Sequence, residues 1–216
     1  NVHHYVFYIF QPFLICCRFF RFLLNGGAAT RQQLFTSLNL SLPTIKQALE
    51  TLEASGLLQP GDKISNTGGR NAVSYQVAAN SRYAIGLFLS LHHLTCASVN
   101  LMGEVLVAER VEWKLNLQDP DYMRELAALV QSVRMRTELP QERMLGVGIA
   151  LPSLVGESGE AAVYGMTSDF TGVTRQFFAE YFPYPVKIYH DSETAGFAEV
   201  WRATEKRNMI YLSLNS

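Results

Sequence analysis

The fold of the first part of this chain is decided by residues 30–56, which read TRQQLFTSLNLSLPTIKQALETLEASG. Thr30 and Ser41 belong to the residue types that cap helix N-termini with a side-chain oxygen. Asn39 and Leu40 precede the second cap and suit a tight turn. The stretch therefore predicts two short helices, one after each cap, joined by a turn.

The second of these helices carries its apolar residues on one side. Ile45, Leu49 and Leu52 repeat at i, i+4 and i+7. Pro43 falls in the first turn, where its missing N–H costs nothing, and Gly56 ends the helix. We expect one face of this helix to be buried and the other to be polar and exposed.

The sequence on either side extends this arrangement. Residues 16–24 read as the end of a further helix, closed by an Asn-Gly-Gly turn signal. Residues 57–77 read as a β-hairpin, with Pro60-Gly61-Asp62 as a turn and a polar, Gly-containing tip. The order helix, helix, turn, helix and hairpin is that of a winged helix-turn-helix, which we place at residues 14–78.

The rest of the chain alternates between strand and helix patterns. Residues 78–81 look like a linker, and a second domain is expected over 82–216. Strands mixed with amphipathic helices indicate an α/β domain. The expected strands are 83–91, 94–100, 105–111, 144–151, 186–189 and 209–214, and the expected helices are 119–136, 174–182 and 193–202.

Composition supports a folded chain with two different halves. Of its 216 residues 48% are apolar and 17% are charged, which argues against disorder. Residues 1–80 hold six basic and three acidic side chains, whereas residues 81–216 hold twelve basic and sixteen acidic ones. This asymmetry fits a nucleic-acid-binding head on a body of another kind.

The cysteines and the N-terminus bear on the compartment. Cys16, Cys17 and Cys96 give no disulfide framework, which favours a reducing compartment, and no spacing suggests a metal site or a cofactor. Residues 5–24 are apolar, but Gln11, Pro12, Arg18 and Arg21 interrupt them, so we expect no membrane span and a cytoplasmic protein. The chain begins with Asn1 and stops inside a strand pattern, which suggests a fragment of a longer protein.

The predicted helix-turn-helix supplies candidate DNA contacts. The second helix of such a pair enters the major groove, while the first lies over the phosphate backbone. Gln can bond adenine, Lys guanine or phosphate, and Thr can touch a thymine methyl. Candidates on the second helix are Ser41, Pro43, Thr44, Lys46 and Gln47, and candidates for phosphate contact are Thr30, Arg31 and Gln32. A three-helix cluster with a solvated polar face would explain the same residues.

The tip of the hairpin adds one further candidate. Gly68 and Gly69 allow a tight turn, and Arg70 could reach from it into a minor groove, whose negative potential attracts guanidinium. A solvent-exposed turn with one charge is the alternative.

With these motifs in order, the chain resembles the ROK family, which contains sugar-responsive repressors and sugar kinases. The head resembles the family's in 23–34 (LLNGGAATRQQL) and 40–45 (LSLPTI), together with the Gly68-Gly69-Arg70 wing. The body resembles it in Ile85-Gly86 and in the stretches 101–106 (LMGEVL), 146–152 (GVGIALP) and 190–195 (HDSETA). The resemblance implies that the second domain is the first lobe of an actin-like, ribonuclease H-like sugar-kinase fold.

One departure from the family pattern bears on activity. Residues 88–92 read FLSLH where ROK kinases have an Asp-x-Gly-Gly-Thr phosphate loop. Phe88 replaces the carboxylate and Leu91 a glycine, and phosphoryl transfer depends on such positioning and charge neutralisation. We therefore expect no kinase activity.

The resemblance also supplies candidate sugar contacts. Asp191 falls on the position that bonds a sugar hydroxyl in the kinases, although it could equally cap a helix starting near Glu193. Glu193 and Asp169 lie at or near other sugar-contacting positions. The family's zinc-binding His and Cys cluster would lie after Ser216, so no metal site is expected here.

The resemblance and the residues together predict a repressor of sugar metabolism. Its partners would be double-stranded operator DNA and a sugar or phosphosugar that shifts DNA affinity, and it would act as a homo-oligomer when complete. A ROK-type ATP-dependent sugar kinase and an inactive truncated remnant are the alternatives.

Overall fold

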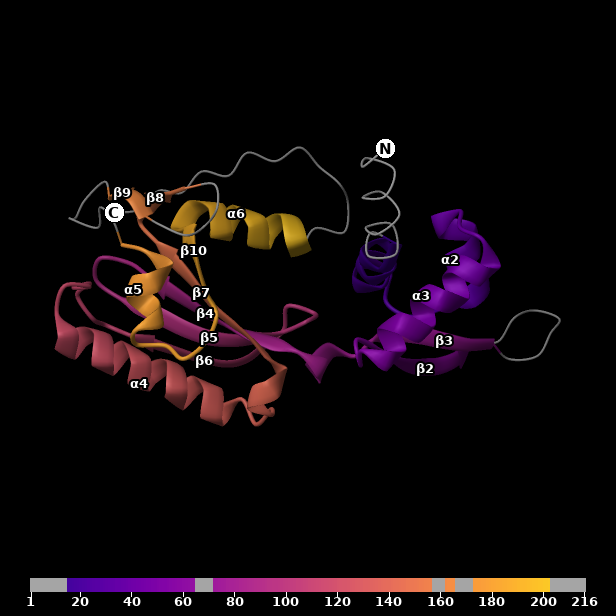
Figure 1. The fold of residues 1–216 in the computed structure, drawn as a ribbon, viewed down its shortest axis with the longest axis horizontal. Helices are drawn as coiled ribbons and strands as arrows, with labels where there is room; N and C mark the ends of the chain where they lie inside the picture. The colour runs from indigo at the N-terminus through magenta and orange to yellow at the C-terminus, as the bar shows by residue number, and fades with distance from the viewer. Residues whose placement is uncertain (1–14, 65–71, 157–161, 166–172, 203–216) are drawn as a thin grey trace, which may run out of the picture. The chain divides into compact units, whose positions relative to one another are not determined.

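The computed structural model describes residues 15–64, 72–156, 162–165 and 173–202. The chain divides into two compact units between Ser81 and Arg82. Figure 1 follows the chain through both of them, and each unit is described by itself.

The first unit combines helices with a small antiparallel sheet. A helix over 15–26 is followed by β1 (Ala29–Thr30), α2 (Arg31–Leu38), α3 (Leu42–Ala54), β2 (Leu58–Ile64) and β3 (Ala72–Val77). The strands lie in the order β1-β3-β2. The helices and the hairpin follow one another as predicted. The strand β1 was not predicted, because two residues are too few to show a periodic pattern.

The helix boundaries of this unit have clear local causes. Thr30 and Gln33 form a capping box: the Thr30 hydroxyl accepts the Gln33 N–H, and the Gln33 side chain accepts the Thr30 N–H. Asn39 ends α2 in the left-handed region, at φ 51°. Ser41 then caps α3. The tight turn between the two helices is confirmed.

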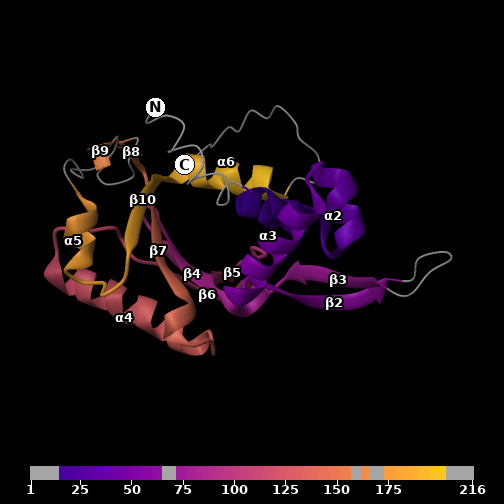
Figure 2. The same ribbon diagram turned by 45° about the vertical axis from the view of Figure 1, so that its right-hand side comes forward.

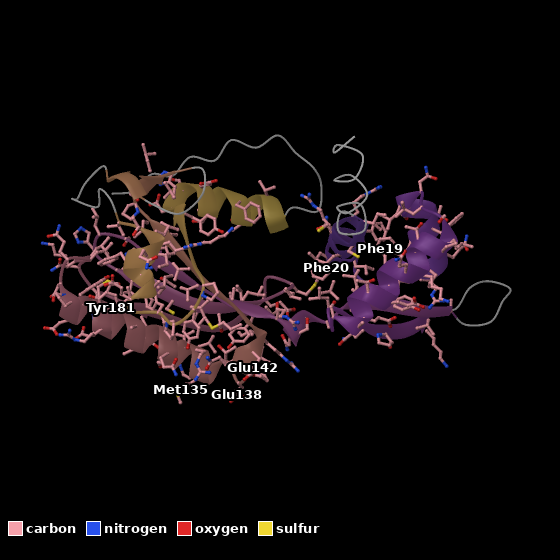
Figure 3. The ribbon with its side chains drawn as sticks, viewed as in Figure 1. Phe19, Phe20, Met135, Glu138, Glu142 and Tyr181 are labelled. Carbon is pink, nitrogen blue, oxygen red and sulfur yellow. The ribbon has the colours of Figure 1, made fainter. Side chains whose placement is uncertain are left out.

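A compact core joins the helices of the first unit to one another. The buried stripe of α3 contains Ile45, Leu49 and Leu52, as its spacing predicts. Leu34 of α2 is fully buried, and so is Phe19 of the first helix, which is labelled in Figure 3. The opposite face of α3 is left exposed.

The predicted turn at Pro60-Gly61-Asp62 is wrong. Strand β2 continues through these residues, and its pairing with β3 is irregular between Pro60 and Lys63, as in a β-bulge. β2 is an edge strand, where a proline is tolerated. A Cβ atom at position 61 would lie 2.6 Å from the hydroxyl oxygen of Ser74, so a larger residue would have to displace that hydroxyl.

The second unit is built on a sheet in the order β10-β7-β4-β5-β6. β4 (Tyr83–Leu89), β5 (Leu94–Asn100) and β6 (Val105–Val111) are antiparallel, while β7 (Met144–Leu151) is parallel to β4 and to β10 (Val186–His190). The predicted mixed α/β class is confirmed.

Helices cover the two faces of this sheet unequally. α4 (Pro120–Arg136) and α5 (Arg175–Ala179) lie on one side, and α6 (Asp191–Arg202) lies on the other (Figures 1 and 2). Short 3₁₀ turns occur at Ala79–Ser81 and Gln141–Arg143. A small hairpin of β8 (Ser153–Val155) and β9 (Ala162–Gly165) was not predicted, because its strands are too short for a periodic pattern.

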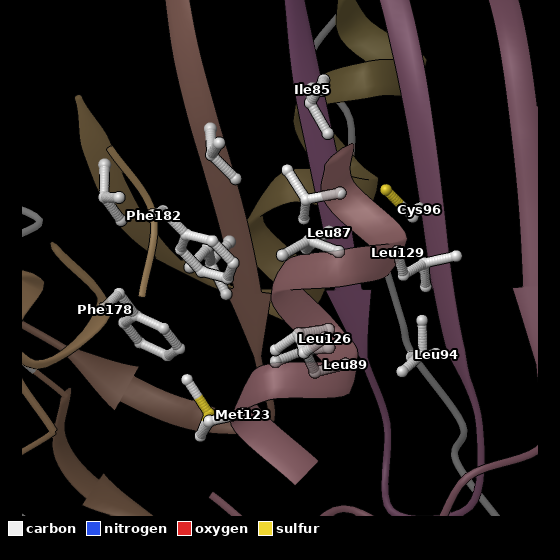
Figure 4. Close-up of a cluster of buried hydrophobic side chains, with 14 of the residues drawn as sticks. Ile85, Leu87, Leu89, Leu94, Cys96, Met123, Leu126, Leu129, Phe178 and Phe182 are labelled. Atoms are coloured by element: carbon white, nitrogen blue, oxygen red, sulfur yellow. The ribbon is translucent and has the colours of Figure 1, made fainter. Parts of the chain in front are cut away.

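Apolar side chains from the sheet and from α4 and α5 form the core of the second unit (Figure 4). Leu87, Leu89 and Cys96 of the sheet meet Leu126 of α4 and Phe178 of α5, and none of the five is more than 1% exposed. At about 25 cal/mol per Å² of buried apolar surface, such a cluster supplies the main driving force for folding. The carboxyl ends of β7 and β10 are thereby fixed side by side.

Candidate nucleic-acid interface and ligand site

The exposed face of α3 carries two of the predicted base contacts. Lys46 and Gln47 are both exposed, on the side opposite the buried stripe. Lys46 Nζ lies 3.7 Å from a Glu50 carboxylate oxygen, and both side chains are about two-thirds exposed, so water screens this ion pair and leaves it weak. Neither side chain is held by the packing of the unit.

The beginning of α3 is rigid. The hydroxyl oxygen of Ser41 accepts the N–H of Thr44 at 3.3 Å and lies 2.8 Å from the Thr44 hydroxyl oxygen. Ser41 and Pro43 are exposed, whereas Thr44 is half-buried. These residues therefore fix the end of α3 that a winged helix presents to DNA.

Leu42 is a candidate that the sequence analysis missed. It lies at the first position of α3 and is 56% exposed, which is unusual for a leucine in a helix with a formed core. An apolar side chain at this point can contact a thymine methyl. Leu42 is in helical phase with Ile45, Leu49 and Leu52, so its spacing predicts burial and no sequence signal marks it as exposed.

The phosphate-contact candidates at the start of α2 have different surroundings. Thr30 is 6% exposed and uses its backbone N–H and hydroxyl in the capping box, so it positions its neighbours and has no surface for a phosphate. Arg31 and Gln32 are exposed. Arg31 Nε donates to the hydroxyl of Tyr75 at 3.0 Å. The candidate Arg70 lies outside the described residues.

Asp191 lies at the carboxyl end of β10 and is 5% exposed. Helix α6 begins at Asp191 itself, so the prediction of a cap before a helix starting near Glu193 is wrong. One carboxylate oxygen, Oδ1, accepts the Ser192 N–H at 2.6 Å and the Ser192 hydroxyl at 3.1 Å. His190 Nδ1 lies 3.1 Å from the same oxygen. The other oxygen, Oδ2, accepts no hydrogen bond from the described residues.

Glu193 belongs to a different part of the surface. It is exposed and lines a groove of about 800 Å³ on the α6 face of the sheet, together with Lys187, Tyr189 and Phe197. Asp191 does not line this groove, so the structure does not bring these two sugar-contact candidates together. Asp169 lies outside the described residues. His190 and Ser192, which do contact Asp191, were not among the predicted site residues.

The connection between β4 and β5 matches the family's phosphate loop in sequence position. It closes as a short turn, in which Ser90 N–H donates to the His93 carbonyl at 2.9 Å and the Ser90 hydroxyl oxygen lies 2.8 Å from His93 Nδ1. Leu89 is fully buried, and the rings of Phe88 and His93 lie 6.1 Å apart. Side chains occupy this turn where a phosphate loop leaves glycine backbone open.

Curated proteins similar to this chain include sugar repressors. No family model matches the chain. A xylose repressor from Caldicellulosiruptor bescii is 22% identical over 196 residues, which cover 89% of this chain and 49% of that protein. N-acetylglucosamine repressors from Escherichia coli and Shigella flexneri are 25% identical over 136 residues, 63% of this chain and 33% of theirs.

The comparison with solved structures covers both units. A ROK-family transcriptional regulator, described as a homologue of the Escherichia coli MLC protein, matches 87% of this chain and 48% of its own, with a TM-score of 0.65 and 19% sequence identity. The chain is similar to the ROK transcriptional regulators.

The similarity to the ROK regulators covers only part of their length. The chain spans about half the length of the xylose repressor and of the solved ROK regulator, and a third of the N-acetylglucosamine repressors. Over the described residues, no helix is long and apolar enough to cross a membrane, and no three metal-ligating side chains gather. All three cysteines are free.

Proposed function

We propose that this chain is the DNA-binding head and first lobe of a cytoplasmic, sugar-responsive transcription repressor of the ROK type. The head reads operator DNA through the exposed face of α3 and holds the backbone through the start of α2. In the complete protein the head acts as part of a homo-oligomer.

The observation that carries this proposal is the first turn and polar face of α3. Ser41 and Thr44 fix the first turn, Lys46 and Gln47 project from the exposed face, and Leu42 offers an apolar contact beside them. A helix with a fixed first turn and exposed polar side chains is the element that a winged helix inserts into a major groove. The named repressors similar to this chain agree with that use.

The body responds to a sugar or phosphosugar through Asp191. Its Oδ2 atom, which accepts no hydrogen bond from the described residues, lies at the carboxyl end of a parallel strand, where α/β folds place their ligands. A ligand that prefers one arrangement of head and body shifts DNA affinity by that preference. Glu193 lies on the groove side of α6 and is not part of this contact.

The chain does not act as a sugar kinase. Phe88 and the closed Ser90–His93 turn leave no carboxylate for Mg²⁺ and no open glycine backbone for phosphates. We expect no protein-dependent ADP release with ATP and any hexose. Turnover that Asp191→Asn abolishes would overturn this part of the proposal.

The proposed base contact is tested by selecting bound sequences from a random pool of duplexes. The full chain should enrich a defined motif, and Gln47→Ala should relax the preference at one or two positions, by about 1–3 kcal/mol for a lost bidentate contact.

Gln118→Ala is the matched control, since Gln118 is an exposed glutamine of the second unit. It should select the same motif as the unaltered chain. If the unaltered chain enriches no motif, or if Gln47→Ala selects the same motif with the same stringency, α3 is not the reading helix.

A further inference from the structure

The side chain of Arg31 is held by a residue from the hairpin. Tyr75 lies on β3, where it pairs with Ala29 of β1, one residue before the cap of α2. Its ring is buried, at 6% exposure, and its hydroxyl accepts the Arg31 Nε–H at 3.0 Å. The Arg31 guanidinium carbon lies 5.6 Å from the centre of the same ring. Hydrogen bond and cation–π contact therefore come from one side chain.

The backbone that carries Arg31 is fixed as well. Thr30 is tied into the sheet by its pairing with Ser74, and its capping box with Gln33 sets the direction of α2. Arg31 thus leaves the first position of a helix whose start cannot rotate freely. An arginine on an open surface would lose its rotamer freedom only on binding, whereas this one has lost much of it beforehand.

The bond through Nε leaves the outer edge of the guanidinium available. An arginine has five N–H donors, and the four on the two Nη atoms remain after Nε is used. Within the described part of the chain, Tyr75 is the one residue that hydrogen-bonds the Arg31 side chain. Two parallel N–H donors match the oxygens of a phosphate, and the start of the first helix of a helix-turn-helix lies over the phosphate backbone.

We propose that Tyr75 is a positioning residue that holds the Arg31 guanidinium with its Nη donors directed to a DNA phosphate. This inference rests on the proposed function, since it concerns how the head contacts the phosphate backbone of its operator. Tyr75 itself does not touch DNA; it acts through Arg31. Its contribution is the same for every DNA sequence, because phosphates carry no base information.

The test is a double-mutant cycle on the full chain, with affinity for a mixed-sequence duplex measured by fluorescence anisotropy over a range of KCl concentrations. Tyr75→Phe keeps the buried ring and removes the hydroxyl. It should weaken binding about three- to tenfold, the range expected when one long side chain must be ordered on binding. Arg31→Gln should weaken binding further and flatten the plot of log affinity against log salt by about 0.9.

The decisive comparison is Tyr75→Phe in the Arg31→Gln background, where it should have no further effect on affinity. Arg31→Lys keeps the charge without the Nε donor, so it too should be insensitive to Tyr75→Phe. A purely structural role of Tyr75 predicts the opposite: the same loss of affinity in all three backgrounds, accompanied by a lower unfolding temperature. That result would overturn the inference, as would unchanged affinity in Tyr75→Phe.

Failure of the inference can be told apart from failure of the proposed function. If the unaltered chain binds duplex DNA and Arg31→Gln weakens it while Tyr75→Phe does not, only the positioning role is lost. If the unaltered chain shows no salt-dependent binding to duplex DNA, the proposed function itself fails.

Discussion

At the scale of single residues, Asp191 is buried and has one carboxylate oxygen that accepts no hydrogen bond from the described residues. A buried carboxylate that bonds a sugar hydroxyl loses affinity when it becomes an amide, by about 1–3 kcal/mol for the unsatisfied group. We therefore expect Asp191→Asn, introduced into the full-length protein, to weaken sugar binding at least about fivefold. Operator affinity without sugar should be unchanged. Titration calorimetry with candidate sugars measures the first and anisotropy the second.

The control for this substitution is Glu193→Gln. Glu193 lines the separate groove, so the Glu193→Gln protein should bind sugar with the same affinity as the unaltered protein. Equal sugar affinity in Asp191→Asn and the unaltered protein would remove Asp191 from the ligand site and leave its Ser192 contacts as its whole role.

The buried thiol of Cys96 predicts how the stability of the second unit depends on pH. Burial raises the pKa of its thiol from 9.0 to about 12. Between those values the unfolded chain has lost a proton that the folded chain keeps, so stability falls as pH rises above 9 and is unaffected below it. Urea unfolding should show the second unit losing stability between about pH 9 and about pH 11, and Cys96→Ala should show a smaller loss.

Cys17 is exposed, so Cys17→Ala should leave the alkaline loss as it is in the unaltered chain. The comparison uses the change with pH within each variant, because removing a buried sulfur alters absolute stability. An alkaline loss that is the same with and without Cys96 would contradict the assignment.

At the scale of elements, the start of α3 depends on Ser41. The Ser41 side chain accepts the Thr44 N–H, and losing such a cap costs about 1 kcal/mol for alanine but only a few tenths for glycine. Ser41→Ala should lower the unfolding free energy of the first unit by that amount, and Ser41→Gly by less. Chemical denaturation followed by circular dichroism measures both. Equal effects of the two substitutions would mean that the cap is not what stabilises α3.

The elements that could be predicted are those with a local physical cause. Caps at Thr30 and Ser41 begin α2 and α3, and the Asp119 cap with Pro120 in the first turn begins α4. The irregularity between Pro60 and Lys63 could not be predicted, because it exists only in the pairing of β2 with β3. The β8–β9 hairpin likewise consists of strands too short for any periodicity.

The candidate site was predictable to a similar degree. The spacing of residues along the helix correctly predicted that Lys46 and Gln47 are exposed. It could not show that Thr30 would be buried, because that follows from the pairing of β1 with β3. Nor could it separate Asp191 from Glu193: they are two positions apart in sequence, but one faces the end of β10 and the other faces the groove.

At the scale of the whole molecule, the two units differ in charge. The basic excess lies in the first 80 residues, and the acidic excess lies in the rest. Under the proposed function, the basic excess of the first unit suits binding to the polyanion DNA. The similarity to ROK regulators extends over both units.

The most direct test of this account is the salt dependence of DNA binding by the chain. Each phosphate contact contributes about −0.9 to the slope of log affinity against log salt, so a head that makes two or more such contacts should lose at least about tenfold in affinity between about 50 and about 200 mM KCl. Arg31→Gln should flatten that slope. Absence of binding at the lowest salt, or affinity that does not change with salt, would contradict the claim that the first unit is a DNA-binding head.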